Sequence, residues 1–179
     1  MALITETGTG AADSEVLCSV AFADTYHAAQ GNTLWAPMQI VEKEQALRRA
    51  YSFMQQTYRA RWAGHRTSYT QALDWPRYDV PREDVGGYAG YLGNFAHYGA
   101  VYPSDAIPKE LQQANAELAL RAAAGDLLDD IEPPVASERV GPIEVTYFQS
   151  AVKTKKYPAV DRLLTPFLKN SGAMLLTRA

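Results

Sequence analysis

The chain of 179 residues contains only one cysteine, Cys18. A single cysteine excludes an internal disulfide and a zinc site built from several cysteines. No apolar run approaches the roughly 20 residues that a membrane helix needs. The opening residues 1–6 lack the basic and apolar regions of a signal peptide. We therefore expect no membrane partner and a product that stays inside the cell or is assembled there.

An excess of positive charge is also missing, because the formal net charge is −3 and the isoelectric point is near 5.6. This argues against a general duplex-DNA-binding protein, whose surface is usually strongly basic. The apolar content of 47% is enough for a hydrophobic core. The length favours one domain over residues 1–179. Within it we distinguish an N-terminal arm (1–18), an inserted loop (79–106) and a C-terminal segment (151–179).

Motifs for catalysis and metal binding are absent as well. His27, His65 and His97 are far apart and lack the spacing of metal ligands. No glycine-rich run precedes a Lys-Ser/Thr pair, and no G-x-S-x-G occurs. Asp129 and Asp130 lie in an acidic linker that ends in two prolines, where carboxylates are usually solvated. We therefore expect no enzyme, no metal site and no cofactor.

The signs of the charges alternate along the chain. Residues 1–42 carry five acids and no Lys or Arg, whereas residues 43–66 carry six basic residues and one acid. Residues 105–138 are again acidic, and residues 151–179 are basic. The pattern fits alternating solvated faces, or opposite patches that join neighbouring copies head to tail. The candidate subunit-interface residues are Arg48, Arg49, Arg59, Arg61, Glu117, Asp129 and Asp130.

Hydrophobic periodicity predicts a mainly α fold, a small bundle of about four helices with a minor β element. The helices are expected over residues 20–30, 39–58, 108–124 and 157–169, and Pro166 should kink or shorten the last one. A strand is expected over residues 139–147, and a short one near residues 16–17.

The inserted loop 79–106 alternates glycines with aromatic residues. Its length exceeds that of ordinary loops, and its aromatic side chains favour burial. Docking of the loop on another chain satisfies both features. The contact residues in this prediction are Tyr88, Tyr91, Phe95, Tyr98 and Tyr102.

The stretch from Tyr58 to Trp75 is the best candidate for binding nucleic acid. Its arginines can hold phosphates, and its aromatic rings can stack bases. The residues in question are Arg59, Arg61, Arg66, Tyr58, Trp62 and Tyr69. In the alternative interpretation Trp62 and Trp75 pack the loop against the helices, and the arginines are solvated or pair with acids of another subunit. The acidic balance of the whole chain favours the alternative.

Several short motifs, in order, carry a resemblance to a known family. They are residues 2–10 (ALITETGTG), 24–28 (DTYHA), 46–50 (ALRRA), 58–64 (YRARWAG), 71–77 (QALDWPR), Ile107-Pro108 before an alanine-rich helix, and 140–145 (VGPIEV). Together they resemble a tailed-phage family labelled DnaT-like single-stranded-DNA-binding proteins. That family is similar in layout to phage head–tail connector, or adaptor, proteins. The 79–106 insertion departs from the family pattern, in which this connection is commonly shorter.

The resemblance implies a virion structural protein, assembled in the host cytoplasm and located at the head–tail junction. Copies would form a ring, expected to be dodecameric, between the portal protein and tail or head-closure proteins. Double-stranded DNA would pass through the ring. A C-terminal element would dock on the portal, and packing on its own bundle is the alternative. The residues of that element are Lys153, Lys155, Lys156, Leu163, Leu164, Phe167 and Leu168. The family label itself implies another function, a single-stranded-DNA-binding replication accessory protein.

Overall fold

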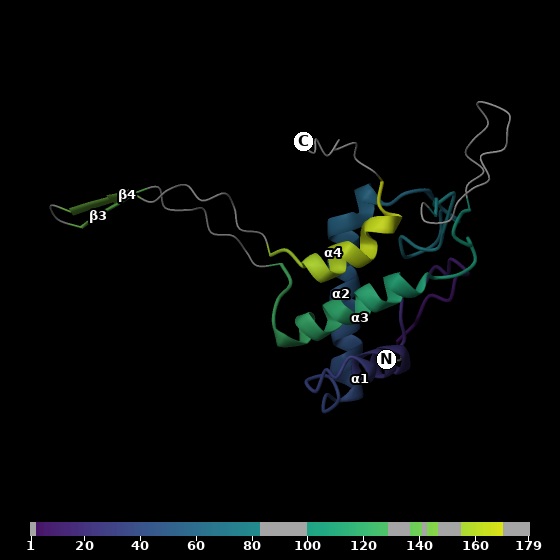
Figure 1. The fold of residues 1–179 in the computed structure, drawn as a ribbon, viewed down its shortest axis with the longest axis horizontal. Coiled ribbons are helices and arrows are strands. Elements are labelled where there is room, and N and C mark those ends of the chain that lie inside the picture. Colours follow the sequence, from purple (N-terminus) through teal and green to yellow (C-terminus); the bar gives the residue numbers. More distant parts are fainter. Residues whose placement is uncertain (1–2, 83–99, 129–136, 141–142, 147–154, 170–179) are drawn as a thin grey trace, which may run out of the picture.

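Four α-helices form the body of the molecule: α1 (Val20–Ala29), α2 (Ile40–Tyr58), α3 (Lys109–Ala124) and α4 (Pro158–Leu164). They are seen in a computed structural model that describes residues 3–82, 100–128, 137–140, 143–146 and 155–169. α3 is the central element, because it contacts each of the other three helices. In Figure 1 α1, α3 and α4 lie at successive heights along α2. The prediction of a mainly α fold is confirmed.

The helix boundaries follow from local capping and from proline. The Ser19 hydroxyl accepts a hydrogen bond from the backbone N–H of Phe22 and so caps α1. At the start of α2 the Glu42 carboxylate accepts one from the backbone N–H of Gln39. Pro166 interrupts the last helix as predicted. α4 ends at Leu164, and a single 3-10 turn, η2 (Thr165–Phe167), follows it.

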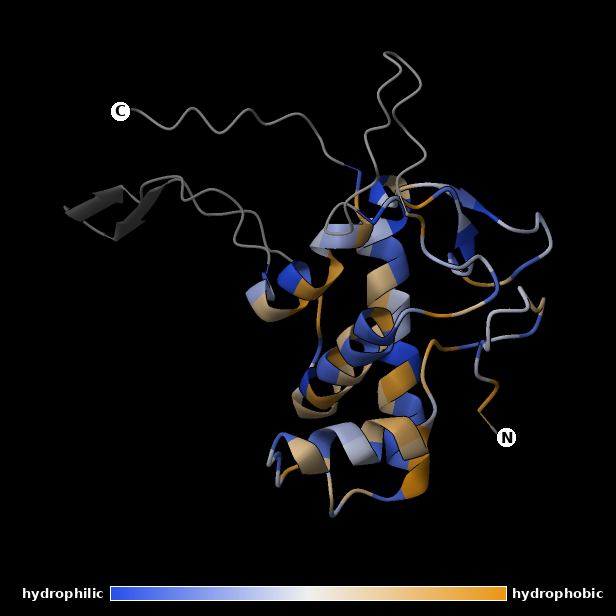
Figure 2. Cartoon of the chain, turned by 45° about the vertical axis from the view of Figure 1, so that its right-hand side comes forward, coloured by the Kyte–Doolittle hydropathy of each residue, from blue (hydrophilic) through white to orange (hydrophobic). Residues whose placement is uncertain are grey.

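The core lies between α2 and α3 and extends to α4. Figure 2 shows apolar residues recurring between polar ones along these helices, as amphipathic helices require. The stripe predicted on α3 is buried, including Leu111, Ala114 and Leu118. One polar residue sits inside this core. The Asn115 amide accepts a hydrogen bond from the backbone N–H of Leu17 and donates one to the carbonyl of Leu47, joining the arm, α2 and α3.

Two small antiparallel ladders make up the minor β element. β1 (His65–Arg66) pairs with β2 (Arg77–Tyr78), and both follow a 3-10 turn, η1 (Arg59–Arg61). β3 (Ser137–Val140) pairs with β4 (Ile143–Thr146). The predicted strand over 139–147 therefore contains β4 and the end of β3. The strand expected near residues 16–17 is reduced to one bridge, between Thr5 and Val16.

The structure describes only the two ends of the inserted loop, residues 79–82 and 100–106. These ends lie side by side, because Pro81 bridges Val101 and the backbone N–H of Tyr102 donates to the carbonyl of Val80. The Tyr102 ring packs on Phe167, with centroids 4.8 Å apart. The predicted contact residues Tyr88, Tyr91, Phe95 and Tyr98 lie outside the described residues. Across the part of the chain that the structure describes, no helix combines the length and hydropathy needed to span a membrane.

Candidate functional site

The segment from η1 to the start of the inserted loop is net positive, although the chain as a whole is acidic. Residues 59–82 contain five arginines and two aspartates, a net charge of +3, whereas the whole chain carries −3. The segment follows the C-terminal end of α2 and includes β1 and β2. It corresponds to the stretch in which the sequence predicts nucleic-acid binding.

Three of these arginines maintain the fold of the segment. The Arg59 Nε donates to the Asp74 carboxylate at 3.0 Å. Arg77 is buried and donates to the carbonyls of residues 63 and 64, each at 2.7 Å. Arg66 donates to two carbonyls in the turn that follows β1. These guanidinium groups position the loop, and most of their hydrogen bonds are made within the segment.

The two tryptophans are also structural, as the alternative interpretation held, and Tyr58, predicted to stack bases, is structural as well. Trp62 and Trp75 are buried and meet edge to face, with centroids 6.0 Å apart. Trp75 packs in the same way on Phe167 at 5.5 Å. The buried Tyr58 hydroxyl donates to the Asp161 carboxylate at 2.6 Å. None of these rings is available for stacking on a base.

What remains exposed is a smaller set of rings and cations. His65 and Tyr78 are cross-strand partners whose ring centroids are 5.4 Å apart, and Tyr78 is 44% exposed. Tyr69 follows β1 by three residues and is 96% exposed. The exposed Arg61 has no carboxylate within ion-pair distance among the described residues, and its backbone carbonyl accepts from the N–H of the exposed Lys169. We call Arg61, His65, Tyr69, Tyr78 and Lys169 the aromatic–basic end.

Most residues predicted for a subunit interface form pairs within the chain. Arg48 pairs with Glu15 at 3.0 Å and with Glu44 at 3.6 Å. Arg59 pairs with Asp74, as described above, and Glu117 accepts from Arg121 and from the Tyr26 hydroxyl. Such intramolecular pairs lower the attraction of these groups for a neighbouring copy.

Arg49 is different, because no carboxylate lies within ion-pair distance of it in the part of the chain that is described. Asp129 and Asp130, the other acids predicted for a subunit interface, lie outside the described residues. Of the predicted interface residues on α2, Arg49 alone therefore combines an exposed position with the lack of a described acidic partner.

The C-terminal element predicted to dock on a portal packs on its own bundle in this structure. Leu164 and Phe167 are fully buried in the core, and Leu163 and Leu168 are half-buried against it. These contacts correspond to the alternative that the sequence left open.

The basic residues before α4 are partly described. The Lys155 Nζ donates to the backbone carbonyl of Asp126 at 2.9 Å, Lys156 is exposed, and Lys153 lies outside the described residues. Lys155 therefore ties the start of α4 to the end of α3.

No constellation for metal or thiol chemistry is seen among the described residues. No group of three His, Cys, Asp or Glu side chains there can hold a metal ion. Cys18 is fully buried, and burial raises the pKa of its thiol to about 12. A thiol with so high a pKa stays protonated, so Cys18 acts as a small packed side chain.

Comparison with known proteins gives one match. A family model described as "Putative DnaT-like ssDNA binding protein" matches residues 1–179. The match covers the whole chain, including the aromatic–basic end and the inserted loop. Searches of curated proteins and of solved structures gave no match.

Proposed function

We propose, from the premise that the chain belongs to the family of DnaT-like ssDNA binding proteins, that it binds single-stranded DNA through its aromatic–basic end. The observation that carries the proposal is that a net-positive segment of an acidic chain exposes aromatic rings, with His65 packed on Tyr78, and exposes Arg61, which pairs with no carboxylate among the described residues. Binding without chemical turnover is the activity that this surface supports.

The exposed rings and cations divide the work of binding. Tyr69 and Tyr78 offer ring faces on which unpaired bases stack. His65 packs against the Tyr78 ring from the neighbouring strand. Arg61 and Lys169 lie beside one another where residues 61–63 bond to residues 167–169 of the same chain, and both attract phosphates. Bases in a duplex are already stacked and paired, so this surface favours single strands.

The small number of cations in the aromatic–basic end sets the expected salt dependence. Each phosphate contact on a single strand contributes about −0.7 to the slope of log K against log salt. If Arg61 and Lys169 each contact one phosphate, we expect a slope between about −1 and −2. Stacking is less sensitive to salt and supplies the remainder of the affinity.

Fluorescence anisotropy with labelled oligo(dT) tests the proposal. We expect Tyr69→Ala and Tyr78→Ala each to weaken binding about tenfold, whereas Tyr69→Phe keeps the stacking face and the affinity. Arg61→Glu should weaken binding and flatten the salt slope. The matched charge change Lys109→Glu, on an exposed residue at the start of α3, should do neither. Equal affinity for all five variants and the wild type would refute this site.

The head-to-tail adaptor of a phage virion is a second candidate function. Exposed apolar residues favour this candidate. They lie at the N-terminal end of α2, about 28 Å along the helix from the aromatic–basic end. There Leu34, Ile40 and Val41 are 74%, 67% and 62% exposed, which is typical of a surface that meets protein. In this candidate copies form a ring between the portal and tail or head-closure proteins.

Mass spectrometry of purified virions tests the adaptor. The adaptor candidate predicts the protein in finished particles and little DNA binding by the free chain. Absence from the particles, together with tight binding of oligo(dT), would reject it in favour of the replication accessory.

A further inference from the structure

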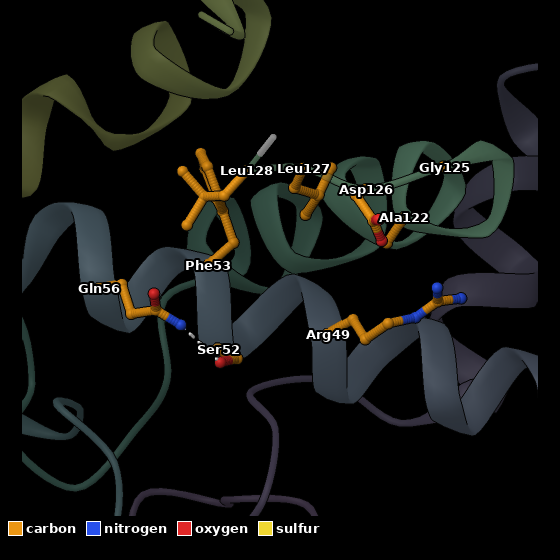
Figure 3. A pocket seen from close by; sticks show the side chains of 9 residues that line it. All are labelled: Arg49, Ser52, Phe53, Gln56, Ala122, Gly125, Asp126, Leu127 and Leu128. Carbon is orange, nitrogen blue, oxygen red and sulfur yellow. Dashed lines mark hydrogen bonds between the residues drawn. The ribbon is translucent and has the colours of Figure 1, made fainter. Parts of the chain in front are cut away.

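A groove runs along the exposed side of α2 beside the C-terminal half of α3. It consists of two hollows of about 170 and 440 Å³ that share Arg49. The first hollow contains Phe53, Leu127 and Leu128 (Figure 3). The second is lined by the side chains Leu34, Met38, Glu42 and Leu120, among others. The α2 residues that line it, from Glu42 to Gln56, cover about 21 Å of the helix.

Each hollow combines apolar side chains with polar ones, and Asp126 lines the first and Glu42 the second, while Arg49 is the basic residue that both share. Figure 3 shows the Arg49 side chain extended along α2, away from Phe53 and Leu128. As described above, Arg49 has no carboxylate partner among the described residues. A segment that combines acidic and apolar residues would complement this surface, because it pairs the guanidinium and fills a hollow.

The sequence that continues from the edge of the groove has this chemistry. Leu128 lines the first hollow and is 50% exposed. The next residues are Asp129, Asp130, Ile131 and Glu132, three acids around one apolar side chain. The chain comes back to the same place, because the Tyr157 hydroxyl donates to the carbonyl of Leu127 and Lys155 donates to Asp126. The described residues on both sides of the 129–154 segment therefore lie at the groove edge.

Among the described helices and strands, β3 and β4 contact only each other. An isolated two-stranded hairpin is marginally stable in water and needs a surface to pack on. The described elements of the same chain do not provide one.

We infer that the groove binds the 129–154 segment of a second copy of this chain. Asp129 or Asp130 of one copy pairs with Arg49 of the other, and Ile131 enters a hollow. Eight residues, 129–136, can extend about 26 Å and so cover the groove. In each copy the segment begins at the edge of the groove. A dimer with two-fold symmetry therefore allows each copy to place its segment in the groove of the other. The inference is independent of DNA binding, since the aromatic–basic end shares no residue with the groove.

Sedimentation of the full chain over a range of concentrations tests the charge pairing. The wild type should form a dimer, and Arg49→Glu should weaken it at least tenfold. Lys109→Glu, the same charge change outside the groove, should leave it unchanged. Adding Asp129→Arg and Asp130→Arg to Arg49→Glu should restore association. A wild type that stays monomeric, or two charge variants that behave alike, overturns the inference.

Disulfide trapping tests the exchange with milder changes. In a Cys18→Ala background, one batch carries Arg49→Cys and a second, differently tagged batch carries Asp130→Cys. Oxidation of the mixture should yield a disulfide between the two tags. A third sample is a chain that carries both Arg49→Cys and Asp130→Cys. If this chain cross-links within itself and the mixture does not cross-link, the segment belongs to its own groove and the inference is wrong. Circular dichroism confirms that each variant retains its helices.

Discussion

At the scale of single residues, Glu6 organises the turn-rich start of the chain. Its carboxylate accepts hydrogen bonds from the backbone N–H groups of Gly8, Gly10 and Ala11 and from the Ser14 hydroxyl, at 2.9 to 3.0 Å. Burial alone would raise the pKa of Glu6, but these four donors outweigh it and hold the pKa below its ordinary value. The ionised carboxylate is thus a structural part of the arm.

We expect Glu6→Gln to destabilise the chain by about 2 to 4 kcal/mol, because an amide turns N–H groups towards the donors that the carboxylate satisfies. The pKa of Glu6 in the unfolded chain is near 4.3, and its pKa in the folded chain lies below that value. The stabilisation is therefore complete above that pH and disappears as the pH falls through the folded pKa. Urea unfolding between about pH 6 and pH 3 measures both effects, with the exposed Asp13→Asn as control. Parallel pH profiles for Glu6→Gln and the wild type would contradict this role.

His27 is a second buried group with a pH-dependent role. Its Nε2 faces the carbonyl of Ala116 at 3.1 Å, and its Nδ1 faces the Asn32 amide nitrogen at 3.0 Å. This arrangement suits a neutral ring with the proton on Nε2. Burial lowers the pKa of His27, although the Ala116 carbonyl and nearby acids act in the opposite direction.

Because its folded pKa is below the unfolded value of about 6.5, His27 stabilises the fold above that pH and less so as the pH falls. Thermal unfolding should therefore show stability decreasing from pH 7 to pH 5. His27→Gln should flatten this profile, whereas His65→Gln, on an exposed residue, should preserve it. A wild-type profile that is flat over this range would contradict the assignment.

At the scale of elements, the arm docks on the start of α3 through a glycine. Gly8 has a φ of +113°, and a Cβ there would overlap the backbone carbonyl of Asp105. Gly31 also has a positive φ, +71°, but a Cβ there would meet nothing within 4 Å. Comparing an alanine at Gly8 with an alanine at Gly31 therefore distinguishes the cost of steric overlap from the cost of backbone strain.

We expect Gly31→Ala to cost about 1 to 2 kcal/mol, the penalty of a positive φ. Gly8→Ala should cost clearly more and should expose the arm to limited proteolysis. Denaturant unfolding of the two variants, with the m-value unchanged, measures the difference between their free energies of unfolding. Similar losses for the two variants would show that the arm does not depend on this close approach.

The four helices are the part of the fold that the sequence predicts well. Their apolar stripes recur with the helical period over two to five turns, and Ser19, Pro108 and Pro166 mark their limits within two residues. β1 and β2 are not predicted, because strands of two residues carry no periodicity. Their pairing depends on Arg66 and Arg77 bonding to carbonyls distant in sequence.

The candidate site is predicted only in part for the same reason. The sequence indicates a basic and aromatic stretch, but it does not separate the buried Trp62 from the exposed Tyr69. Tyr78 and Lys169 lie outside the predicted stretch and join it only through strand pairing and a backbone bond. Exposed aromatic residues next to basic ones are the signal that could have found Tyr78, since Arg77 precedes it.

At the scale of the whole molecule, the surfaces proposed to bind DNA and protein lie at different parts of α2. The aromatic–basic end follows its C-terminus, the groove runs along its side, and exposed Leu34, Ile40 and Val41 adjoin its N-terminus. An acidic chain can thus bind an anionic polymer locally while the remaining surface is left for protein contacts. Self-association would raise the number of DNA sites on one particle and so strengthen binding along a strand.

Photo-cross-linking to single-stranded DNA that contains iododeoxyuridine, followed by peptide mass spectrometry, tests the central claim most directly. The account predicts cross-links at Tyr69 and Tyr78, which decrease when unlabelled oligo(dT) competes and persist when duplex DNA competes. Cross-links confined to other parts of the chain, or none at concentrations that saturate a known single-strand binder, would contradict it.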